Sequence, residues 1–97
     1  MIDYVVEIAP PAEREITEAI QWYATKSLPA ANTFRNLIFD SIALIANSPL
    51  SWAKVSERGI RRFVLPRYPY TLFFHVAGST VTIVAVTHHH RAPTDWS

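Results

Sequence analysis

Residues 59–96 read GIRRFVLPRYPYTLFFHVAGSTVTIVAVTHHHRAPTDW, and they contain three short runs that favour β-structure. Phe, Tyr, Val, Ile and Thr dominate these runs, while Pro, Gly and Ser occupy the breaks between them. Gly78 can adopt the positive φ of a tight hairpin turn, so the second and third runs should pair antiparallel. The segment therefore predicts a β-meander, with strands from Ile60 to Leu65, Tyr70 to Val76 and Val81 to Thr87.

The first half of the chain predicts one strand and two helices. Residues 3–8 alternate weakly between apolar and polar side chains and then meet Pro10-Pro11, where a helix should begin because the first helical turn accepts proline. That helix should end near Ser27, and Pro29 should open a second helix that runs from Ala30 to Ala46. The short link between them predicts an antiparallel helical hairpin.

The element order predicts an α+β fold of two layers, β-α-α-β-β-β, in which the antiparallel helical hairpin packs on an antiparallel sheet. At 97 residues the chain should form a single domain over residues 1–97. The pairing position of the first strand stays open at this point.

Both predicted helices carry an apolar stripe at spacings of three and four residues. The stripe of the first helix consists of Ala12, Ile16, Ala19, Ile20 and Tyr23, and that of the second of Phe34, Leu37, Ile38, Ser41, Ile42 and Ile45. The second helix has further apolar residues outside its stripe, including Phe39, Ala43 and Leu44. One packing partner does not need so wide an arc, so this helix is expected to offer a second apolar surface.

Composition and charge exclude several classes of protein. The chain has no cysteine, which excludes disulfide frameworks and zinc-thiolate sites. It has no basic leader followed by an apolar run and no apolar run long enough to cross a bilayer, so we expect a soluble cytoplasmic protein without a membrane partner.

The net charge of +1 is unevenly distributed. Residues 1–50 carry three Lys and Arg against six Asp and Glu, giving −3, whereas residues 51–97 carry six against two, giving +4. The basic half suits an anionic partner, either a nucleic acid or an acidic protein segment, although basic residues also simply solvate the outer face of a sheet.

The basic and histidine side chains of the meander are the candidates for chemistry. RNA cleavage through the 2′-hydroxyl needs an acid, a base and cations, which His and Arg can supply. Arg61 and Arg62 are neighbours on a strand and must point to opposite faces, so at most one of them can join such a site.

The run His88-His89-His90 is a poor metal site. Only His88 and His90 can share a face in an extended segment, and no third ligand is evident near them. We expect no metal and no cofactor, since P-loop, dinucleotide-binding and Ser-His-Asp patterns are also absent.

Several short motifs together resemble one known family, the RelE/ParE superfamily of bacterial type II toxins, also called plasmid stabilisation proteins. The motifs that carry the resemblance span nearly the whole chain: Pro11-Ala12-Glu13-Arg14-Glu15-Ile16, Trp22-Tyr23, Pro29-Ala30-Ala31 with Phe34, Ser48-Pro49, Arg61-Arg62-Phe63, Pro69-Tyr70, and Val86 to Pro93 with Trp96. The fold that the resemblance implies, two helices packed on an antiparallel sheet, agrees with the prediction from the residues.

The resemblance implies a cytoplasmic toxin that a cognate antitoxin, ParD-like or similar, holds inactive. An antitoxin segment would cover exposed apolar surface, so Phe39, Ala43 and Leu44 become the antitoxin-binding candidates. The superfamily has two branches, one that cleaves messenger RNA in the ribosome and one that poisons DNA gyrase without cleaving RNA.

The RelE-like, ribosome-dependent branch would make Arg61, Arg62, His88 and Arg91 the catalytic candidates. The chain departs from that branch, because only Lys54 precedes the meander where a lysine-rich stretch is expected, no Tyr stands at the C-terminus, and Ala92 takes a position that is often acidic in relatives. We therefore favour a ParE-like, non-enzymatic gyrase poison over an endoribonuclease. Its target-binding candidates are Arg67, His88, His90, Arg91 and Trp96. A family member that has lost its toxicity and remains an antitoxin partner is a third alternative.

Overall fold

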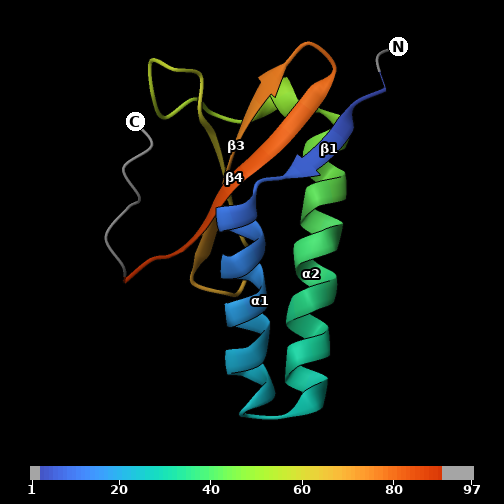
Figure 1. Cartoon of the computed structure of the whole chain (residues 1–97), viewed down its shortest axis with the longest axis vertical. Helices are drawn as coiled ribbons and strands as arrows, with labels where there is room; N and C mark the ends of the chain where they lie inside the picture. Colours follow the sequence, from blue (N-terminus) through green and yellow to red (C-terminus); the bar gives the residue numbers. More distant parts are fainter. Residues whose placement is uncertain (1–2, 91–97) are drawn as a thin grey trace.

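The computed structural model describes residues 3–90 and arranges them in two layers, a helical hairpin and a four-stranded sheet (Figure 1). The predicted element order and α+β class are confirmed. The elements are β1 (Val5–Ile8), α1 (Pro10–Ala24), α2 (Leu28–Asn47), the short 3-10 helix η1 (Pro49–Ser51), β2 (Arg61–Val64), β3 (Tyr70–Ala77) and β4 (Thr80–His88).

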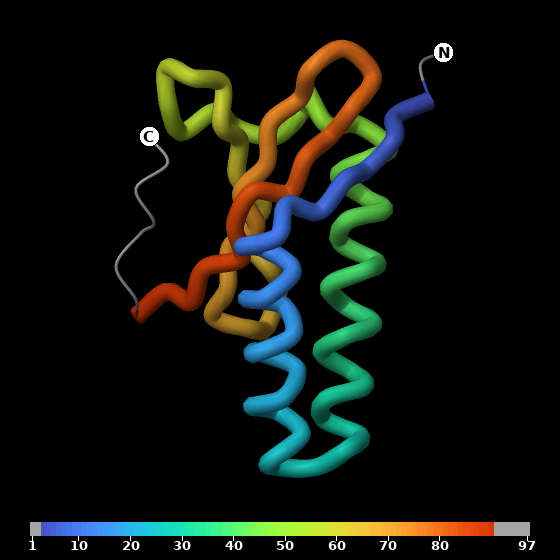
Figure 2. The backbone as a smooth tube through the Cα atoms, in the orientation of Figure 1, coloured from blue at the N-terminus to red at the C-terminus, as the bar shows by residue number. Residues whose placement is uncertain are grey.

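The two helices begin and end where proline and capping residues dictate. Proline occupies the first turn of α1, as predicted, and Glu13 places its negative charge in the same turn, where the helix dipole favours it. The second helix starts two residues earlier than predicted, because the Ser27 side chain caps it by accepting a hydrogen bond from the Ala30 N–H at 3.0 Å. The hairpin extends beyond the sheet at its turn, as the backbone trace in Figure 2 shows.

The strand order is β1-β4-β3-β2, and β2, β3 and β4 form the predicted antiparallel meander. The prediction that the whole sheet is antiparallel is wrong for β1, which pairs parallel with β4. The helical hairpin explains this difference: α1 continues the direction of β1 and α2 returns the chain, so β2 starts where β1 started. Since β4 runs in the same direction as β2, a first strand beside β4 is parallel to it.

The first strand joins β4 because the outer edge of β2 is already partly covered by its preceding loop. The Arg62 N–H donates to the Ala53 carbonyl at 3.1 Å, and the Val55 N–H donates to the Ile60 carbonyl at 2.7 Å. A sheet edge with paired backbone groups is a poor template for another strand. The edge of β4 is therefore the one with which β1 pairs.

Beyond the end of β1, the side chain of Glu15 from α1 supplies a hydrogen-bond acceptor to the edge of β4. β1 ends at Ile8, and the Glu15 carboxylate then accepts a hydrogen bond from the Val86 N–H at 2.9 Å. A buried backbone N–H without an acceptor is costly, so this carboxylate satisfies a group that the short strand cannot reach. Glu15 therefore fastens α1 to the sheet edge.

The core lies between the hairpin and one face of the sheet. The predicted stripes are confirmed, since Ala12, Ile16 and Ala19 of α1 are buried, and so are five members of the α2 stripe: Phe34, Ile38, Ser41, Ile42 and Ile45. Phe34 is fully buried and its ring contacts three tyrosines, with ring centroids 4.7 Å from Tyr23, 5.1 Å from Tyr68 and 5.3 Å from Tyr70. Tyr23 comes from α1, Tyr70 from β3 and Tyr68 from the turn between β2 and β3, so Phe34 joins the layers.

Within the described residues, no helix combines the length and the apolar character that crossing a bilayer requires.

Replacing the central ring should be strongly destabilising. We expect Phe34→Ala to lower the free energy of unfolding by about 3–5 kcal/mol, because it removes buried apolar area and leaves a cavity among three tyrosine rings. Urea denaturation measures this loss. The control Leu28→Ala, at a side chain that is 71% exposed, should change stability by less than about 0.5 kcal/mol. Equal effects at the two positions would contradict the assignment of Phe34 to the joint between the layers.

Candidate functional site

A β-bulge near the middle of the β3–β4 pair determines which way the histidines at the end of β4 point. Phe73 lies opposite Ala85, but Phe74 lies opposite Ile83, so Val84 is an extra residue in β4. A bulge of this kind reverses the alternation of side chains that follow it. As a result His88 faces the helix layer, opposite Tyr70, rather than the open face of the sheet.

The redirected His88 forms one wall of a pocket of about 370 Å³ where the end of α1 meets the sheet. The pocket is lined by Trp22, Tyr23, Pro69, Tyr70, His88 and His90, and we call it the aromatic–histidine pocket. The His88 ring meets the Tyr70 ring edge to face with centroids 5.0 Å apart, and it lies 5.3 Å from the His90 ring. His88 and His90 therefore lie on the same side, which the sequence allowed only for this pair of the three histidines.

Hydrogen bonds at the end of β4 set the orientation of each histidine. The His90 N–H donates to Nδ1 of His88 at 3.1 Å, which leaves the proton of a neutral His88 ring on Nε2. His89 turns to the other side, where its Nε2 lies 3.0 Å from the Thr71 hydroxyl and its backbone N–H donates to the Pro69 carbonyl at 2.8 Å.

No group of three potential metal ligands exists within residues 3–90.

The floor of the pocket is apolar and its rim is partly exposed. Burial raises the pKa of the Tyr23 phenol, and the nearby Tyr70 and Tyr68 add to the shift, so Tyr23 stays protonated and can donate a hydrogen bond. Trp22 stands on the rim with 55% of its surface exposed, and the Lys26 ammonium lies 4.9 Å from its ring centroid. Such a pocket can hold an apolar or aromatic side chain of a protein partner and orient it with a few polar groups.

The two arginines of β2 lie on opposite faces of the sheet, as predicted. Arg61 is opposite Phe74 on the helix side, where its Nη1 donates to the carbonyls of Trp52 at 2.6 Å and Leu50 at 3.3 Å. Arg62 is exposed on the other face. Arg61 therefore stabilises the loop that follows α2.

The three catalytic candidates within residues 3–90, Arg61, Arg62 and His88, are not assembled into one site. Arg61 pairs with Phe74, and His88 pairs with Tyr70, so four residues of β3 separate their positions along the sheet. That spacing corresponds to about 13 Å along the strand. Arg91 lies outside the described residues, as does the target-binding candidate Trp96.

Arg67 lies apart from the histidines, in the turn between β2 and β3. It lines a cleft beside α2, and Tyr68, which shares this cleft, also contacts Tyr23 of the aromatic–histidine pocket. The structure therefore divides the three described target-binding candidates between two regions, with His88 and His90 in the pocket and Arg67 in the cleft.

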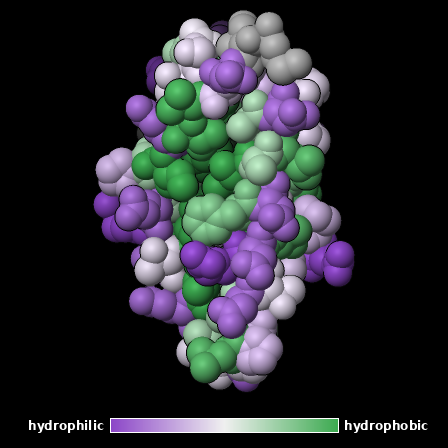
Figure 3. Space-filling view, turned by 90° about the vertical axis from the view of Figure 1, so that its right-hand side faces the viewer, coloured by the Kyte–Doolittle hydropathy of each residue, from purple (hydrophilic) through white to green (hydrophobic). Residues whose placement is uncertain are grey.

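The three antitoxin-binding candidates are exposed on α2, but they do not form one patch. Phe39 is 44% exposed and lies one turn from Ala43, while Leu44, which is 56% exposed, lies on the other flank of the exposed helix surface. The Arg35 guanidinium lies 5.4 Å from the Phe39 ring centroid. Figure 3 looks onto the α2 side and shows apolar side chains gathered on its upper half.

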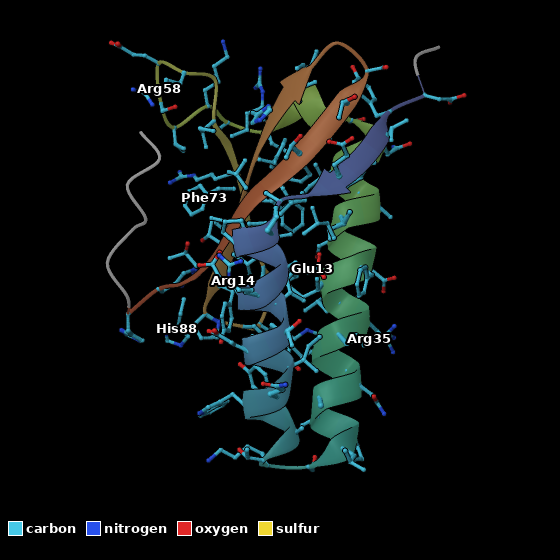
Figure 4. All side chains as sticks on the ribbon, viewed as in Figure 1. Glu13, Arg14, Arg35, Arg58, Phe73 and His88 are labelled. Atoms are coloured by element: carbon cyan, nitrogen blue, oxygen red, sulfur yellow. The ribbon has the colours of Figure 1, made fainter. Side chains whose placement is uncertain are left out.

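The pocket and the outer surface of α2 face different directions. In Figure 4 His88 lies on one side of the molecule, and Arg35 projects from α2 on the opposite side. Two partners could therefore bind without competing for the same side chains.

Sequence reasoning missed the aromatic–histidine pocket because it placed Tyr23 on the apolar stripe of the first helix and used Trp22 and Tyr70 only as motif or strand residues. One signal was present in the sequence: Trp22 lies off the apolar stripe to which Tyr23 belongs, so an exposed indole beside a buried phenol could have been expected. The bulge, which turns His88 toward them, leaves no signature in the sequence.

Comparison with known proteins gives two findings. The model of a family described as the ParE toxin of type II toxin-antitoxin system, parDE, matches residues 6–93. A solved structure described as the chromosomal ParDE TA system from P. aeruginosa is similar in fold, with a TM-score of 0.77 at 19% sequence identity, and the match covers 89% of this chain and 96% of that chain. None of the curated proteins matches the chain.

Alanine substitutions of the two neighbouring arginines should show that Arg61 stabilises the fold and that Arg62 does not. We expect Arg61→Ala to lower the free energy of unfolding by about 1–3 kcal/mol, because it leaves the carbonyls of Leu50 and Trp52 without their donor. Arg62→Ala removes the same charge from an exposed position and should cost less than about 0.5 kcal/mol. Chemical denaturation of both variants checks this, and a cost for Arg62→Ala as large as that for Arg61→Ala would contradict the assignment.

Proposed function

The chain belongs to the ParE toxin family of type II toxin-antitoxin systems, and from this membership we propose that it is a toxin that inhibits DNA gyrase by binding and that a ParD-like antitoxin neutralises it. The membership confirms the resemblance seen in the motifs. The observation that carries the proposal is the extent of the family match, which includes every helix and nearly all of every strand.

The positions of the basic residues support binding rather than RNA cleavage. A scissile phosphate needs its acid, base and cations within hydrogen-bond reach of one point. Arg61 donates to two loop carbonyls, Arg62 lies on the opposite face, and His88 lies about 13 Å further along the sheet. The described residues therefore do not converge on one scissile phosphate, as the ribosome-dependent endoribonuclease alternative would require.

We propose the aromatic–histidine pocket as the target-binding site. Trp22 supplies a large exposed ring at its rim, and aromatic side chains at pockets commonly dominate the energy of protein interfaces. His88 and His90 supply polar groups on one side of it. Arg91 follows His90 directly in the sequence and Trp96 lies five residues further on, and both remain candidates for the same contact surface.

We propose the exposed apolar residues of α2 as part of the antitoxin-binding surface. Phe39 and Leu44 expose about half of their side chains, and a partner segment that covers them would remove apolar area from water. This surface lies away from the pocket, which is compatible with an antitoxin that acts by wrapping the toxin rather than by filling its target site alone. The proposed site of action is the cytoplasm, and the proposed activity uses no cofactor.

Purified protein tests the proposal in a gyrase supercoiling assay. We expect the chain to inhibit supercoiling and to increase the amount of cleaved DNA, and we expect the antitoxin encoded by the neighbouring gene to reverse both effects. Trp22→Ala should weaken inhibition about 30-fold if the indole is a central contact, and His88→Ala should weaken it less and without abolishing it. Leu50→Ala, which alters an exposed apolar side chain far from the pocket, is the control and should leave inhibition unchanged.

A different set of results would reject the proposal. Unimpaired gyrase together with cleavage of messenger RNA on ribosomes, abolished by His88→Ala, would identify an endoribonuclease. Equal inhibition by the wild-type chain and Trp22→Ala would leave gyrase as the target but would exclude the pocket as its binding site.

A further inference from the structure

The turn between β2 and β3 holds an arginine in a backbone conformation that arginine rarely adopts. Arg67 has a φ of 66°, and it is the only residue other than glycine with positive φ within residues 3–90. A Cβ atom makes this region unfavourable, so Gly or Asn normally occupies such a position. The chain has arginine there instead.

The packing around the turn forces Arg67 into this conformation. The Leu65 N–H donates to the Tyr70 carbonyl at 2.9 Å, and both of these side chains are almost fully buried. The Tyr68 ring packs edge to face against Tyr23 and Phe34. Because Leu65 is buried in the core and Tyr68 packs against it, the turn holds the backbone of Arg67 between two anchored positions.

Arg67 borders a cleft of about 270 Å³ between the turn and α2. The cleft is lined by Thr33, Asn36, Leu37, Asp40, Arg67 and Tyr68. Arg67 is exposed, and the structure gives its guanidinium no hydrogen bond or ion pair to any other described residue, Asp40 included. The cleft thus combines an available guanidinium with amide, hydroxyl and carboxylate groups around an apolar floor.

We propose that this cleft binds an acidic segment of the antitoxin, with a carboxylate of that segment on the Arg67 guanidinium. A guanidinium pairs with a carboxylate through two parallel hydrogen bonds, and the rigid turn reduces the ordering that such a pair requires. Asp40 lines the same cleft, so the antitoxin segment should also carry a hydrogen-bond donor, such as a lysine or an amide, next to the carboxylate that pairs with Arg67. The assignment rests on the proposed function, because that function supplies the antitoxin.

The position of the cleft favours the antitoxin over the target. Leu37 lies in the cleft, and Leu44 is seven residues further on, so both are on the same flank of α2. Leu44, one of the exposed residues proposed for the antitoxin, therefore lies on the flank of α2 that borders the cleft, two turns further along the helix. The aromatic–histidine pocket lies on the other side of Tyr68 and Tyr23. A single antitoxin segment could cover Leu44 and reach Arg67.

The substitution Arg67→Asn tests the proposal, because asparagine tolerates positive φ but lacks the guanidinium. We expect it to raise the melting temperature by roughly 4–8 °C, as expected when the strain of one residue is relieved in a domain of this size, and to weaken antitoxin binding about tenfold or more. The probe is the antitoxin encoded by the neighbouring gene, titrated against the full chain by calorimetry. Binding should also depend less on salt concentration in the variant.

Two further variants control for charge and for geometry. Arg58→Asn removes the same charge from an exposed loop residue and should leave the affinity unchanged. Arg67→Lys keeps the charge but not the paired donors, so its affinity should lie between those of the wild-type chain and Arg67→Asn.

Three results would overturn the inference. If Arg67→Asn binds the antitoxin as tightly as the wild-type chain does, the cleft is not part of the antitoxin interface. If Arg58→Asn weakens binding equally, net charge rather than this site explains the effect. If the wild-type chain itself does not bind the antitoxin, the proposed neutralisation fails and this inference fails with it.

Discussion

The contact of the Phe34 ring with three tyrosines is the interaction on which the rest of the structure depends. Phe34 belongs to α2 and Tyr23 to α1. Tyr70 belongs to β3 and Tyr68 to the turn that precedes it, so one cluster joins both layers. Burying one such ring contributes about 1.5–3 kcal/mol, and well-oriented ring pairs add to it. The same cluster supports the floor of the aromatic–histidine pocket and the base of the Arg67 turn.

This shared support explains how a small fold offers two separate surfaces. Tyr23 and Tyr70 line the pocket on one side of the cluster, and Tyr68 lines the Arg67 cleft on the other. The proposed function requires the chain to bind two different proteins, and placement of both surfaces on one core would satisfy that requirement. Arg61 contributes in another way, because it holds the loop after α2 in place.

The sequence was sufficient for features that depend on local periodicity. The spacing of Ala12, Ile16 and Ala19 predicted the buried side of α1, and strand alternation predicted that Arg61 and Arg62 face opposite ways. Features that depend on long-range register could not be predicted. The parallel pairing of β1 with β4, the bulge at Val84 and the positive φ of Arg67 follow from how distant segments meet. Long-range register also hid the position of His88 in the pocket, since the bulge turns this side chain to the face of the sheet that carries Tyr70.

The claim that this ParE family member acts by binding gyrase is tested most directly in living cells. The chain would be expressed under tight control in bacteria, and DNA breaks and the ends of messenger RNAs would be mapped during the first minutes. The account predicts gyrase-dependent breaks in DNA while early messages stay intact. Rapid cuts within translated messages, without early DNA damage, would contradict it.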